Sequence, residues 1–167
     1  MYPEIKEPVF HLKEGKDAAK IAHDVLKSYE KEFGKAPLFW QCFHAETLQR
    51  FKSEFNSKYP RILLIDDGDL DLGNVQKLDK QLADIAKYSD GIGPSLSHVF
   101  NAEGQSTRLV ELAHKNKLLV HAYTVRADQL PAYVDSLDEY LKKIFQEEKI
   151  DGVFTDFTDK VVHFLDR

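Results

Sequence analysis

The sequence predicts an α/β protein that forms part of a TIM-type (β/α) barrel. Three observations predict it: short apolar runs that fit buried strands, amphipathic helices between them, and polar residues directly after each run. Apolar runs alternating with helices are typical of parallel strands covered on both faces. A complete barrel usually needs ~250 residues. Because the chain has 167 residues, we expect six β/α units and not eight.

The six expected strands are short and buried. They lie at residues 2–6, 38–40, 62–65, 91–93, 118–120 and 152–154. Polar residues follow or end these runs, among them Gln41, Asp66, Ser95, Tyr123 and Asp156. Since the carboxyl ends of parallel strands carry the chemistry of a β/α barrel, we expect a functional site among these polar residues at the strand ends.

Helical periodicity fills the gaps between the strands. The first long helix has an apolar face whose members recur every four residues: Ile21, Val25, Tyr29 and Phe33. A later helix repeats in the same way at Val75, Leu78, Leu82 and Ile85. Ser106 is the expected cap of a short helix, and Ser136 with Glu139 has the form of a capping box. We find no linker, so residues 1–167 are expected to form one domain.

Composition and charge exclude several classes of function. The net charge of −5, with both signs interleaved, argues against a nucleic-acid partner. No run of ~20 apolar residues is present, so we expect no membrane span. No signal peptide is visible after Met1, which predicts a cytoplasmic protein if the chain is expressed as it stands.

Five segments in register carry a resemblance to a known family. They are Tyr2–Lys6, Gln41–Phe43, Tyr88–Pro94, His121–Arg126 and Asp151–Phe157. In this order and spacing the chain resembles the C-terminal two-thirds of glycerophosphodiester phosphodiesterases, specifically the bacterial periplasmic type. In that family the segments are barrel strands 3, 4, 6, 7 and 8, which leaves Arg61–Asp66 as strand 5. The resemblance therefore implies a partial barrel made of strands 3–8.

The resemblance also implies a chemistry. The family hydrolyses glycerophosphodiesters to glycerol 3-phosphate and an alcohol, in phospholipid and glycerol metabolism, and it is periplasmic. It uses a divalent cation, calcium in the first place with magnesium as the alternative, which offsets charge on the phosphate. Two histidines serve as general acid and base. They belong to motifs expected ahead of Met1, so we assign no catalytic residue in this chain and expect it to be inactive alone.

Four residues of this chain match site positions of the family. Glu4 matches a metal ligand and Lys6 a phosphate contact, and the two share one face of a strand because they are two residues apart. Gln41 and Tyr123 would line the glycerol side of the pocket. A hard cation prefers about six oxygen ligands. With Glu4 as the one carried-over ligand, we expect weak or no metal binding by this chain alone.

The remaining polar residues have structural interpretations. We expect His23, His114 and His163 on solvated helix faces, and His121 as a buried, hydrogen-bonded histidine on a strand. His11 and His44 follow strands and could reach the rim of the pocket. The acidic segment 66–71 is interpreted as a solvated loop, and Asp156 as a cap or positioning group for the final turn.

A barrel without strands 1 and 2 has two open edges, at residues 2–6 and 152–157. Such edges favour pairing with another chain. We therefore expect either a complementing N-terminal segment or self-association through the barrel edges, besides a glycerophosphodiester substrate. The alternative function is non-catalytic: a degenerate barrel fragment that binds phosphorylated polyols or self-associates.

Overall fold

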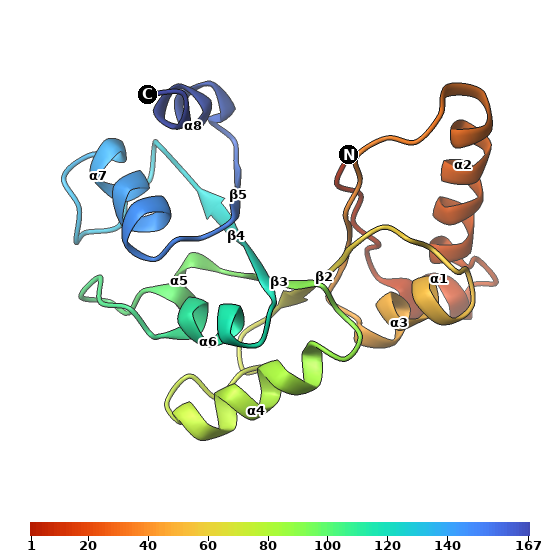
Figure 1. Cartoon of the computed structure of the whole chain (residues 1–167), viewed down its shortest axis with the longest axis horizontal. Helices are drawn as coiled ribbons and strands as arrows, with labels where there is room; N and C mark the ends of the chain where they lie inside the picture. Colours follow the sequence, from red (N-terminus) through yellow and green to blue (C-terminus); the bar gives the residue numbers. More distant parts are fainter.

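A computed structural model describes residues 1–167, and its centre is a parallel sheet of five strands that curls as half of a barrel (Figure 1). The strands lie side by side in chain order. They are β1 (Trp40–Cys42), β2 (Arg61–Ile65), β3 (Gly91–Pro94), β4 (Leu119–Val125) and β5 (Gly152–Thr155). The predicted partial β/α barrel is confirmed at the level of fold class.

Helices lie between consecutive strands of the sheet, and others lie ahead of β1 and after β5. They are α1 (Pro8–Lys13), α2 (Ala18–Phe33), α3 (Ala45–Ser53), α4 (Val75–Ile85), α5 (Leu96–Val99), α6 (Leu109–Lys115), α7 (Leu137–Lys142) continued by the π-helical turn η1 (Lys143–Glu147), and α8 (Thr158–Leu165). None of these helices combines the length and the apolar character needed to cross a lipid bilayer.

The first expected strand, residues 2–6, is reduced to a single bridge. Glu4 pairs in parallel with Gln41 of β1. Two backbone hydrogen bonds support this pairing, from Gln41 N to Pro3 O at 3.1 Å and from Ile5 N to Gln41 O at 2.9 Å. The expected pairing of this segment with β1 is therefore confirmed, but the prediction that residues 2–6 form a regular strand is wrong. Only one flank of this segment is paired, and Pro3 has no N–H to donate.

The other strands differ from expectation mainly at their ends. β1 begins at Trp40 where Leu38 was expected, and β4 extends to Val125. The approach of β3 to β4 depends on a glycine. A Cβ at Gly91 would lie 2.6 Å from the carbonyl oxygen of Leu119, so a larger residue would push the paired strands apart.

Burial falls from the centre of the sheet toward its C-terminal edge. All five residues of β2 are buried, whereas all four of β5 are only half-buried. The core on the helix side includes Trp40 and Phe51, whose rings stack with centroids 4.2 Å apart. The centre of the half barrel is thus packed like a normal domain, and the β5 edge is left partly uncovered.

The apolar face expected on α2 points away from the core, which corrects the expectation. Ile21, Val25, Tyr29 and Phe33 are 42–65% exposed, while Ala19, His23 and Leu26 form the buried face of the helix. The expectation of a solvated His23 is accordingly wrong. A four-residue repeat identifies one face of a helix but does not say which face meets the sheet.

A second exposed apolar patch lies on α8. Val161 is buried, but Val162 and Leu165 are 46% and 55% exposed. In Figure 1, α2 and α8 stand at the two ends of the half barrel, with the sheet between them. Apolar surface is therefore concentrated at both open flanks.

Ser136, Ser106 and Asp156 are the three residues expected to cap or position a helix end, and the structure gives them different roles. Ser136 accepts a hydrogen bond from the Glu139 amide at 3.2 Å, which confirms the N-terminal cap of α7. Ser106 is not a helix cap, because α6 is preceded by Arg108 in the left-handed region and Ser106 Oγ accepts from the Arg108 amide. Asp156 is not a cap either. At the start of α8, it is Thr155 Oγ1 that accepts from the Phe157 amide.

Candidate functional site

The four residues matched to site positions lie along the carboxyl edge of the half barrel. Glu4 bridges Gln41, and Tyr123 near the end of β4 bridges Ser95, directly after β3. Parallel pairing brings equivalent ends of the strands to one edge, so sequence positions separated by more than a hundred residues meet there. The edge also receives the acidic loop that follows β2.

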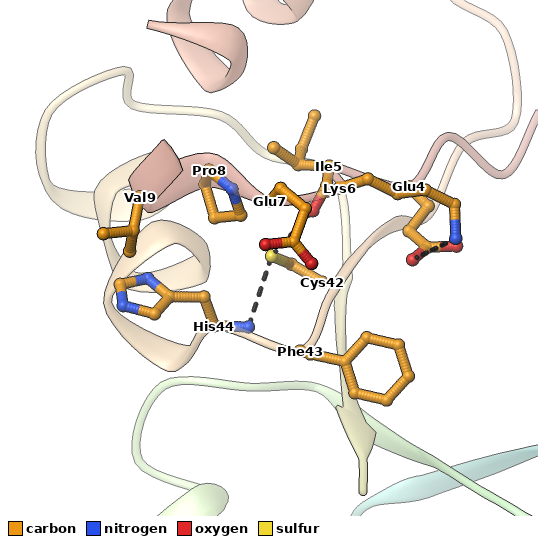
Figure 2. A pocket seen from close by; sticks show the side chains of 9 residues that line it. All are labelled: Glu4, Ile5, Lys6, Glu7, Pro8, Val9, Cys42, Phe43 and His44. Atoms are coloured by element: carbon orange, nitrogen blue, oxygen red, sulfur yellow. Dashed lines mark hydrogen bonds and ion pairs between the residues drawn. The ribbon is translucent and has the colours of Figure 1, made fainter. Parts of the chain in front are cut away.

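A pocket of about 330 Å³ opens at this edge beside the N-terminal segment (Figure 2). Its lining comes from two stretches of chain, residues 4–9 and 42–44. Glu4 and Lys6 are part of the lining, whereas Gln41 and Tyr123 are not. Phe43 connects the pocket with Tyr123. It lines the pocket, and its ring meets the Tyr123 ring edge-on with centroids 6.3 Å apart.

Glu4 and Lys6 form an ion pair at the mouth of the pocket, with Nζ 3.0 Å from Oε1 (Figure 2). The Lys6 side chain is 75% exposed and that of Glu4 21%. An exposed pair of this kind contributes roughly 0–1 kcal/mol to stability. Little energy is therefore needed to separate the two groups, and the Lys6 ammonium is accessible to an anion.

Gln41 and Tyr123 are held by backbone carbonyls. The Gln41 amide nitrogen donates to Tyr2 O at 3.3 Å, which leaves its amide oxygen as an acceptor. The Tyr123 hydroxyl donates to Ile65 O at 2.8 Å and keeps its own oxygen lone pairs. Burial raises the pKa of Tyr123, and Asp66, Asp67, Asp69 and Glu4 raise it further. Both side chains can therefore accept hydrogen bonds from hydroxyl groups.

Cys42 lies at the base of the pocket but is a structural residue. Its Sγ donates to Ile5 O at 3.0 Å and accepts from the His44 amide at 3.3 Å. The side chain is fully buried, and this burial raises the pKa of the thiol, with Glu4 and Glu7 acting in the same direction. A thiol held protonated is a poor nucleophile.

Few possible cation ligands gather at this edge. Nowhere do three histidine, cysteine, aspartate or glutamate side chains converge as cation ligands. Glu4 and Glu7 both line the pocket, but they supply too few oxygens for calcium, which prefers about six to eight. Carboxylates of the Asp66–Asp71 loop accept hydrogen bonds from backbone amides of the same loop. Asp69 Oδ2 accepts from the Asp66 amide, and Asp66 Oδ1 accepts from the Asp67 amide.

His44 and His98 lie near the carboxyl edge of the half barrel. His44 lines the pocket, with its Nδ1 3.0 Å from the Thr47 hydroxyl, whereas His11 is not part of the lining. His98 was not singled out from the sequence. Its Nε2 lies 2.8 Å from Asp67 Oδ1, across two strand tips. The only sequence signal for this pair is that each residue follows an expected strand.

His121 has the environment expected for it. It is 9% exposed, and its Nδ1 lies 2.6 Å from the Tyr2 hydroxyl. Burial lowers the pKa of this imidazole. The group is therefore neutral near pH 7 and serves as a hydrogen-bonded part of the barrel interior.

Comparisons with known proteins show which family the sequence matches. A model of the "Glycerophosphoryl diester phosphodiesterase family" matches residues 1–160. A glycerophosphodiester phosphodiesterase of Haemophilus influenzae is 30% identical and one of Treponema pallidum 31% identical, each over 99% of this chain. The chain covers 52% and 53% of these two relatives, so it spans about half of their length.

The fold has a counterpart among solved structures. A protein of Silicibacter pomeroyi, named as a proposed glycerophosphoryl diester phosphodiesterase, superimposes with a TM-score of 0.66 at 16% identity. The match includes 98% of this chain and 49% of the other. At this identity the likeness concerns the fold alone, and it matches the half barrel with half of a longer chain.

Proposed function

This chain belongs to the glycerophosphoryl diester phosphodiesterase family, and from that premise we propose that it supplies part of a phosphodiesterase site, with contacts to the phosphate, the glycerol and a cation. The proposed reaction is hydrolysis of a glycerophosphodiester to glycerol 3-phosphate and an alcohol. The observation that carries the proposal is the position of Glu4, Lys6, Gln41 and Tyr123 along one carboxyl edge, where Glu4 and Lys6 line a pocket and the Lys6 ammonium is accessible.

Each of the four residues has a proposed role. Lys6 attracts a non-bridging phosphate oxygen, because its ammonium is exposed and held only by a weak ion pair. Gln41 and Tyr123 accept hydrogen bonds from the glycerol hydroxyls through the oxygens left free by their backbone contacts. Glu4 offers one carboxylate oxygen to a divalent cation, calcium or magnesium. The other ligands would come from outside the two stretches that line this pocket.

We further propose that two additional β/α units complete the site by covering the open flanks. Three observations support this: the half-buried β5, the exposed apolar faces of α2 and α8, and a matched length of about half in the relatives. Those units would bring the proton-transfer groups and the remaining cation ligands. The periplasmic location implied by the family resemblance is part of the same proposal.

A reconstitution assay tests this function. The remaining β/α units of the Haemophilus influenzae relative are fused ahead of Met1 of this chain, or supplied as a separate chain. Glycerophosphocholine and calcium are added, and release of glycerol 3-phosphate is measured. We expect turnover from the fusion and none above background from the chain alone. Release of glycerol 3-phosphate by this chain without the added units would contradict the proposal that it supplies only part of the site.

The competing function is a non-catalytic module that binds a phosphorylated polyol at the same edge. The accessible Lys6 supports binding in either case. The two functions differ in the fusion: a binding module gives saturable binding of glycerol 3-phosphate and no turnover, whereas the proposed half-site gives both.

A further inference from the structure

A second pocket, of about 150 Å³, lies at the opposite end of the half barrel from the candidate phosphodiesterase site. It is formed by the middle of α2, the segment that leads into β1, and the loop that leads into β2. Its lining residues are His23, Leu26, Lys27, Glu30, Lys35, Ser57, Lys58 and Tyr59. Because Lys35 precedes β1 and Lys58 precedes β2, the pocket lies toward the amino ends of these strands.

The pocket is positively charged although the chain as a whole has a net charge of −5. Three lysines and one glutamate give its lining a formal charge of +2. Glu30 is already engaged: it accepts hydrogen bonds from the Tyr59 hydroxyl and from Lys27, the latter at 3.1 Å. Lys58 donates to the neutral amide of Asn56 at 2.8 Å, and Lys35 acts on Glu30 only through space, where it helps to lower the pKa of that carboxyl. Neither of these two ammonium groups donates a hydrogen bond to a carboxylate.

His23 adds an unused polar group to this lining. The residue is only 8% exposed, and its Nδ1 is buried without a hydrogen-bond partner. The imidazole ring is held in place by stacking on Phe55, with centroids 5.2 Å apart. Nδ1 itself is enclosed by protein, and neither ring nitrogen forms a hydrogen bond with another group of the chain, so the imidazole of this pocket-lining residue keeps Nε2 free for a ligand.

We propose that this pocket binds a phosphate group, held by the Lys35 and Lys58 ammonium groups and by the imidazole N–H of His23. Phosphate fits the chemistry of the lining, because ammonium groups bind it as point charges and a neutral imidazole can donate to its oxygens. Ser57 and Tyr59 place further polar atoms at the wall. This phosphate site uses none of the residues at the carboxyl edge and stands independently of the proposed hydrolysis.

The phosphate can be free or esterified, and two titrations distinguish these sources. The whole chain, labelled at histidine, is titrated with inorganic phosphate at constant ionic strength, and the ring resonances of His23 are followed. A parallel titration uses glycerol 3-phosphate. Tighter binding of the ester assigns the site to a phosphomonoester, and equal or weaker binding assigns it to free phosphate.

We expect a saturable shift of the His23 resonance and a rise of the His23 pKa when phosphate is bound, because a nearby anion favours the charged imidazole. Lys58→Met and Lys35→Met should each weaken binding about two- to fivefold. Lys31→Met is the matched control, since Lys31 is an exposed residue of α2 that does not line the pocket. Absence of saturation, or equal weakening by Lys31→Met, overturns the proposal.

Discussion

The Tyr2 hydroxyl and His121 Nδ1 lie 2.6 Å apart and connect the N-terminal segment with β4 across the interior of the half barrel. The Tyr2 ring also meets Phe154 of β5 edge-on, with centroids 4.8 Å apart, and stacks on Phe39 at 5.2 Å. The two ends of the sheet are therefore joined by side chains where no backbone pairing joins them. This cluster fixes the position of the segment that carries Glu4 and Lys6.

Tyr2→Phe should lower the free energy of unfolding by about 1–3 kcal/mol, because it leaves the buried His121 Nδ1 without its partner. Urea denaturation of the two proteins measures the difference. Tyr29→Phe is the control: this hydroxyl is on the exposed face of α2 and should matter by less than about 0.5 kcal/mol. Equal effects of the two substitutions would contradict the assigned role of the Tyr2–His121 contact.

Stability should fall as the solution becomes mildly acidic. Burial lowers the pKa of His23 and of His121 below the ordinary value of 6.5. The unfolded chain then takes up protons first, so stability is constant above about pH 6.5 and is lost as the pH falls toward the folded-state pKa values. Urea midpoints between pH 7.5 and 5.0 test this. In the double variant His23→Gln, His121→Gln the loss over that range should become clearly smaller, and an unchanged profile would show that these two histidines do not cause it.

The exposed face of α2 should drive self-association in the absence of a covering unit. Val25→Lys combined with Phe33→Lys removes two of its most exposed apolar side chains, which are 65% and 64% exposed. Sedimentation velocity should show a shift toward monomer. Val75→Lys, which changes a single exposed valine on α4, should leave the distribution as it is in the unmodified chain. A monomeric unmodified chain at all concentrations would rule out association through this face.

In the reconstituted enzyme, Lys6→Gln should raise KM for glycerophosphocholine by about tenfold or more, because a charge-assisted contact to phosphate is lost. Lys16→Gln, at an exposed position after α1, is the control and should leave KM unchanged. A change in kcat without a change in KM would place Lys6 in transition-state stabilisation and not in substrate binding.

The sequence predicted the parallel β/α architecture and the polar residues at the strand tips, because buried apolar runs and their polar ends are local signals. It could not predict that the α2 repeat faces outward, since periodicity does not state which face meets the sheet. The burial of His23 follows from that orientation and was missed with it. The His98–Asp67 pair and the Tyr2–His121 contact depend on the distance between strand tips far apart in the chain, which only the folded structure gives.

The most direct test of the proposed half-site is the effect of Glu4→Gln on glycerol 3-phosphate release by the reconstituted enzyme in calcium. Glu7→Gln is the matched control, because Glu7 lines the same pocket but is not the proposed cation ligand. We expect Glu4→Gln to lower the rate by about 100-fold or more, and Glu7→Gln to change it by less than about threefold. Full activity of the Glu4→Gln enzyme would contradict the claim that this half barrel supplies part of the phosphodiesterase site.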